Sequence, residues 1–156
     1  MKASDYLDLA DELVKRDHGA ALRTAVSRAY YAVFNCIAGF YEDEGIHFDR
    51  VDNRHVKFQH ILTNCGLTEL QELAVRVASL HAERKRADYD MSDVRVEKKT
   101  VCEAAVLSAH DCMKDFARHK DRSVAGAKKY CTETLKLPVA TRPKSGQQKS
   151  QSPHKQ

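Results

Sequence analysis

Several features that mark particular protein classes are missing from this chain of 156 residues. No apolar run reaches the ~18 residues that a membrane-spanning helix needs, and no stretch alternates apolar and polar residues as a half-buried strand does. The N-terminal residues are acidic and amphipathic, so no signal peptide is predicted. These absences favour a helical protein that does not enter a membrane, and we expect it to be cytoplasmic.

The sequence also lacks the common patterns for disulfides, metals and phosphate loops. Its five cysteines are scattered and include no CxxC pair, which is typical of reduced thiols. There is no glycine-rich phosphate loop. His47, His55 and His60 do not have the spacing of zinc ligands, and no acidic pattern accompanies them. We therefore expect neither a metal nor another cofactor.

Charge is distributed unevenly along the chain. The net charge is +4, but residues 121–156 hold eight Lys or Arg against Asp121 and Glu133. This segment carries +6 and the first 120 residues carry −2. The basic character therefore belongs to the C-terminal extension, and it does not predict a basic nucleic-acid-binding face on the folded part.

Helical periodicity is the dominant pattern over the first 120 residues. Apolar positions spaced three and four apart predict helices at 4–14, 20–44, 54–65, 69–88 and 96–120. The fold class that follows is all-α, an antiparallel bundle of four main helices with a short extra helix in the middle connection. We assign residues 1–120 to this bundle and 121–156 to a basic extension, largely disordered from about 138. Within the extension, residues 125–136 could extend the last helix or dock weakly on the bundle.

The most apolar helix in this set carries an arginine. Residues 24–40 are apolar on nearly every face, which indicates a helix at the centre of the bundle, and Arg28 lies near its start. A buried guanidinium needs an anionic partner. We predict an ion pair between Arg28 and Asp88 or Asp90 of the later helix.

Two short motifs give the chain a family resemblance. SRAYYAVF at 27–34 and ERKRADYD at 83–90 occur in the order and spacing of a prokaryotic branch of the HEPN family. The chain resembles this family over about residues 3–118. The resemblance implies a helical bundle that forms a homodimer with a functional groove at the two-fold interface. It also implies a role in toxin–antitoxin or defence systems, with a nucleotidyltransferase-type antitoxin as a partner.

Many members of the family are metal-independent ribonucleases that use an arginine followed, four to six residues later, by a histidine. The late motif here departs from that pattern, because Arg84 is followed by other side chains and no histidine. The spacing recurs elsewhere, at Arg50–His55, Arg54–His60 and Arg76–His81. The last two residues are about 140° apart on an ideal helix, so we expect their side chains to diverge.

These observations define the candidate site residues. The candidate catalytic residues are Arg54, His55, His60 and Arg84, and the candidate RNA- or nucleotide-binding residues are Arg84, Arg86, Tyr31 and Tyr89. The arginines would contact phosphates, and the tyrosines would stack on bases or simply pack in the core.

Three functions stay open on the sequence. The first is a noncatalytic module that binds RNA, a nucleotide or a nucleotidyltransferase partner. The second is an active metal-independent endoribonuclease toxin, and the third is a helical protein-interaction scaffold. The missing histidine in the late motif favours the first over the second.

Overall fold

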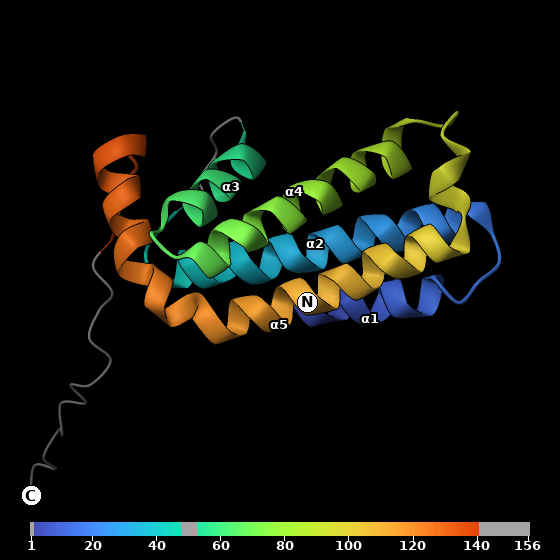
Figure 1. Cartoon of the computed structure of the whole chain (residues 1–156), viewed down its shortest axis with the longest axis horizontal. Coiled ribbons are helices and arrows are strands. Elements are labelled where there is room, and N and C mark those ends of the chain that lie inside the picture. Colours follow the sequence, from blue (N-terminus) through green and yellow to red (C-terminus); the bar gives the residue numbers. More distant parts are fainter. Residues whose placement is uncertain (1, 48–52, 141–156) are drawn as a thin grey trace, which may run out of the picture.

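The chain folds as an all-α bundle (Figure 1). The computed structural model describes residues 2–47 and 53–140. In chain order the helices are α1 (Ala3–Leu13), α2 (Gly19–Asp43), α3 (Arg54–Asn64), α4 (Thr68–Tyr89), the 3₁₀ turn η1 (Val94–Glu97), α5 (Lys99–Tyr130) and the π-turn η2 (Cys131–Leu135). The predicted fold class is confirmed, and the described part of the chain contains no strand, only an isolated bridge between Ile46 and Val139.

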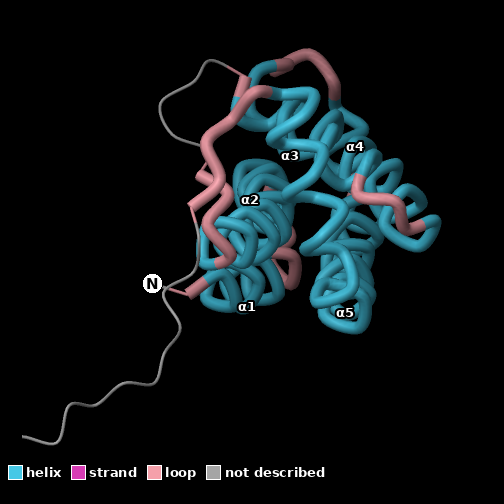
Figure 2. Tube along the Cα trace, turned by 90° about the vertical axis from the view of Figure 1, so that its left-hand side faces the viewer, coloured by secondary structure: helices cyan, strands magenta, loops and turns pink. Residues whose placement is uncertain are grey.

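Helix α2 is the centre of the bundle, as its apolar sequence predicts. It packs against α1, α4 and α5, and the end-on view shows these helices around it, with α3 above (Figure 2). Its large side chains Tyr30, Ile37 and Tyr41 are completely buried. The N-terminal end of α2 meets the C-terminal end of α4, so these two helices are antiparallel.

The last long helix extends past the predicted domain boundary. We predicted an end at residue 120, but α5 continues to Tyr130 without a break. The reason is a further buried face, in which Ser123, Ala127 and Cys131 follow one another at four-residue spacing. The backbone N–H of Ala140 then donates to the carbonyl of Gly45 at 2.9 Å, so residues 138–140, predicted to be disordered, are part of the packed structure. Residues 141–156 of the predicted extension lie outside the described residues.

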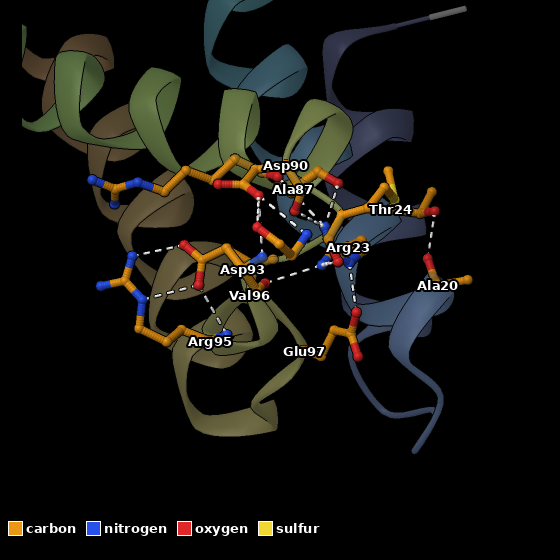
Figure 3. A network of polar contacts seen from close by, with 12 residues as sticks. Ala20, Arg23, Thr24, Ala87, Asp90, Asp93, Arg95, Val96 and Glu97 are labelled. Atoms are coloured by element: carbon orange, nitrogen blue, oxygen red, sulfur yellow. Dashed lines mark hydrogen bonds and ion pairs between the residues drawn. The ribbon is translucent and has the colours of Figure 1, made fainter.

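The buried arginine of α2 is Arg23, and not Arg28. Its side chain is only 9% exposed, and its Nε donates to the Glu97 carboxylate at 2.8 Å. Its two terminal nitrogens donate to backbone carbonyls just at and beyond the end of α4, including those of Ala87 (3.2 Å), Asp90 (2.9 Å) and Asp93 (3.0 Å) (Figure 3). A cation at this position satisfies carbonyls that have no partner within the helix.

The predicted ion pair between Arg28 and Asp88 or Asp90 is therefore wrong. Among the described residues Arg28 forms no ion pair with Asp88 or Asp90, and its guanidinium lies over the rings of Tyr6 and Tyr31, 5.7 and 5.9 Å from their centroids. The face of α2 that meets α4 carries Arg23 and, one turn later, Ser27, whose hydroxyl donates to Asp88. Arg28 lies on the side of α2 that meets α1.

Candidate functional site

An open cleft of about 530 Å³ lies between the first turn of α3 and the C-terminal half of α4. Seven of its eight lining residues carry a polar or cationic group. The lining residues are Asn53, Arg54, His55, Val56, His81, Arg84, Lys85 and Tyr89.

Local helix geometry explains why these side chains meet. Asn53 precedes α3 in the left-handed conformation with φ of 75°, which asparagine tolerates better than most residues, and it sets the direction in which the helix starts. Arg54 and His55 then fall in the first turn. On α4, His81, Arg84 and Lys85 share one face because they are three and four residues apart.

Two imidazoles form the inner wall of the site. The rings of His55 and His81 stack with their centroids 5.1 Å apart and an interplanar angle of 23°. The buried Tyr30 of α2 stacks on His81 at 4.9 Å, and its hydroxyl is 2.6 Å from Nδ1 of His55. Burial lowers the pKa of both imidazoles, and the positive charge of Arg84 lowers it further. Both histidines are therefore neutral at pH 7.

Arg84 is the central cation of the site. Its side chain is only 12% exposed, and its Nε lies 2.8 Å from the Asp88 carboxylate, although the N–H does not point at that oxygen. A terminal nitrogen donates to the hydroxyl of Tyr31 at 2.5 Å. The guanidinium lies over the rings of Tyr31 and Tyr89, 4.9 and 5.3 Å from their centroids. These contacts hold the guanidinium in place, whereas the ring of the 71% exposed Tyr89 stays open to a ligand.

Arg54 supplies a more exposed charge than Arg84 at the rim of the cleft. Its side chain is 46% exposed and pairs with Glu42 of α2 at 2.6 Å. Its guanidinium also lies 5.4 Å from the ring centroid of Phe34. An exposed ion pair of this kind contributes little to stability, so Arg54 is free to exchange its carboxylate for another anion at small cost.

Five of the predicted site residues come together here. Arg54, His55, Arg84 and Tyr89 line the cleft, and Tyr31 contacts it through Arg84. Two others do not. His60 lies in a separate groove between α3 and α4, and Arg86 does not line the cleft but pairs with Glu83 on the exposed surface.

The outcome for the arginine–histidine spacings is mixed. Arg76 and His81 diverge as predicted, because Arg76 pairs with Asp115 of α5 at 2.7 Å while His81 stacks on Tyr30. Arg50 lies outside the described residues. We considered His81 only as the partner of Arg76 in the sequence. Its three-residue spacing to Arg84 puts both on one face of a helix and is the signal that could have identified it as a site residue.

The donor set favours an anionic ligand over a metal ion. Within residues 2–47 and 53–140, no three His, Cys, Asp or Glu side chains are grouped so that they could hold a metal ion. The helices described there also include none that is both long and apolar enough to cross a membrane. Two guanidiniums, a lysine and two neutral imidazoles are suited to binding the oxygens of a phosphate.

Comparison of the chain with protein-family models, with curated proteins and with solved structures finds no match.

Proposed function

We propose that this chain is a HEPN-like module that binds RNA or a nucleotide through the cleft between α3 and α4. The observation that supports the proposal is the convergence of Arg54, Arg84, His55 and His81 on one cleft that Tyr89 also lines. Arg84 is prepared for phosphate because its guanidinium is already held between aromatic rings, so little freedom is lost on binding.

The exposed ring of Tyr89 favours a nucleic acid or nucleotide over a simple anion. Its edge of the cleft combines a cation with an open aromatic face, which is the combination that binds a phosphate and its neighbouring base. The cleft is open to solvent and lies on one side of the bundle, so a strand can enter and leave it.

Replacing Arg84 with alanine is expected to weaken binding of a short single-stranded RNA at least about tenfold, because the central phosphate contact is lost. Fluorescence anisotropy at fixed salt measures the affinity. The matched control is Arg76→Ala, which removes an arginine from the same helix and breaks its ion pair with Asp115 on another face. Equal affinities for the two variants, or no binding by the wild type, would contradict the proposal.

A second candidate function is metal-independent cleavage of RNA. It is favoured by two neutral imidazoles 5.1 Å apart beside Arg84, because one imidazole can accept the proton of a 2′-hydroxyl while an arginine stabilises charge on the phosphoryl oxygens. Histidines from α3 and α4 would then replace the one missing from the late motif.

Cleavage of RNA in the presence of a chelator tests this second candidate. We expect His55→Ala and His81→Ala each to reduce cleavage by about 10²–10⁴-fold, whereas His60→Ala, on the neighbouring groove, leaves the rate unchanged. A folded wild type that binds RNA without cleaving it would restrict the function to binding. Growth arrest on induced expression is the corresponding readout in cells.

The resemblance alone supports the remaining part of the proposal. We propose a homodimer that acts in a toxin–antitoxin or defence system, with a nucleotidyltransferase-type antitoxin as its partner. If the wild type fails to bind RNA but forms a stable complex with such a protein, the interaction-scaffold alternative is the better interpretation.

A further inference from the structure

The hydroxyl of Tyr30 distinguishes the two histidines of the cleft from each other. Tyr30 is completely buried in α2, and its hydroxyl lies 2.6 Å from Nδ1 of His55. This is the one hydrogen bond that the hydroxyl makes within the described part of the chain. His81 stacks on the same tyrosine ring, but neither of its nitrogens makes a hydrogen bond there.

The direction of this hydrogen bond follows from the burial of Tyr30. Burial raises the pKa of the Tyr30 hydroxyl, so the group keeps its proton at neutral pH. A buried hydroxyl proton needs an acceptor, and Nδ1 of His55 is the acceptor within reach. If Nδ1 carried a proton instead, the hydroxyl of Tyr30 would be left without an acceptor.

We propose that Tyr30 is a positioning residue that fixes His55 as the tautomer with its proton on Nε2, so that His55 presents a hydrogen-bond donor to the cleft. Because Nδ1 is occupied by the buried hydroxyl, Nε2 is the nitrogen available to a ligand in the cleft that His55 lines. His81 has no such constraint and is the imidazole that can accept a proton.

The groups around His55 also favour its neutral form. Burial of the ring and the guanidiniums of Arg84 and Arg54 disfavour a positive charge on it. The neutral His81 of α4 stacks on the ring, and Tyr30 and Tyr31 of α2 face it. A neutral imidazole with its proton on Nε2 donates to a phosphoryl oxygen without the cost of burying another cation beside Arg84. The use of this donor toward a ligand rests on the proposed function, but the hydrogen bond itself does not.

The experiment is a long-range proton–nitrogen NMR correlation on the full chain labelled with nitrogen-15, followed through a pH titration. In the wild type we expect His55 to show a protonated Nε2 and a bare Nδ1 that accepts a hydrogen bond. In Tyr30→Phe we expect the hydrogen-bonded signature of Nδ1 to disappear and the proton affinity of His55 to rise about threefold to tenfold, because the neutral form loses its donor.

Tyr41→Phe is the matched control. Tyr41 is on the same helix and is also completely buried, and its hydroxyl is hydrogen-bonded to Ser123 of α5 at 2.9 Å rather than to His55. This variant should leave the tautomer and the titration of His55 unchanged. A wild-type spectrum with the proton on Nδ1 would overturn the inference without any variant, and so would a Tyr30→Phe titration identical to that of the wild type.

Adding a short single-stranded RNA to the labelled wild type separates this inference from the proposed function. Binding should shift the Nε2 resonance of His55 and leave its Nδ1 hydrogen bond with Tyr30 in place. RNA that binds without moving Nε2 would overturn the donor role. Absence of any binding would contradict the proposed function, while the tautomer of the free protein would still decide whether Tyr30 positions His55.

Discussion

Replacing Arg23 with alanine is expected to lower the free energy of unfolding by about 3–5 kcal/mol, a large part of the stability of an ordinary domain. The variant removes the buried cation that pairs with Glu97 and satisfies the carbonyls at and just beyond the end of α4. The buried carbonyl of Ala87 would lose this donor, and the connection from α4 to α5 would lose its anchor on α2. Urea denaturation followed by circular dichroism measures the change.

The control for this prediction is Arg28→Ala on the same helix. Arg28 contacts Tyr6 and Tyr31 by cation–π geometry and forms no ion pair within the described residues, so we expect a loss of about 1 kcal/mol or less. Arg23→Lys should recover only part of the lost stability, because an ammonium cannot reach the same set of acceptors as a planar guanidinium. Equal losses for Arg23→Ala and Arg28→Ala would contradict this account of the α4 end.

Gly126→Ala is expected to destabilise the protein by about 3 kcal/mol, because α5 passes directly over the end of α3 at this residue. A Cβ atom on Gly126 would lie 1.9 Å from the carbonyl oxygen of Cys65, which is backbone at the C-terminal cap of α3 and cannot rotate away. Relief of this overlap requires α3 and α5 to separate. The melting temperature and the denaturant midpoint both report the change.

Gly39→Ala is the control for Gly126→Ala, and we expect it to have the opposite effect on stability. Nothing lies within 4 Å of a Cβ atom placed on Gly39, which is inside α2. We therefore expect this variant to be more stable by about 0.5–1 kcal/mol, from helix propensity alone. If Gly126→Ala were also stabilising, the close contact between α5 and Cys65 would be wrong.

Arg23→Ala and Gly126→Ala also affect the helices that carry the candidate site, because Arg23 contacts the end of α4 and Gly126 contacts the end of α3. Arg23 holds the end of α4, whose last turns contain Arg84, Asp88 and Tyr89. A loss of RNA binding in Arg23→Ala would therefore follow from loss of structure, and stability must be measured beside affinity for every variant.

Much of the site was predictable from local sequence, because helix periodicity fixes which neighbours along a chain share a face. Arg84 and Tyr89 were identified from the late motif, and Arg54 and His55 from the arginine–histidine spacings in the middle segment. His81 was overlooked as a member of the site because its partner His55 is 26 residues away, and no local pattern records which face of α4 meets α3.

Local sequence also could not predict which of Arg23 and Arg28 is buried in the core. The two residues are five positions apart, about 140° around the helix, and both have apolar neighbours in the sequence. The choice between them depends on where α1 and α4 pack around α2. That choice placed Arg23 against the end of α4 and left Arg28 between two tyrosines.

The sequence by itself determined an all-α bundle with an apolar central helix, because helical periodicity and the burial of apolar side chains are properties of each segment. Tertiary structure alone decided which arginine is buried, that α5 continues to Tyr130, and that Tyr30, His55 and His81 meet beside Arg84. These are contacts between residues distant in the chain, and their energies depend on the complete packing of the helices rather than on any local sequence.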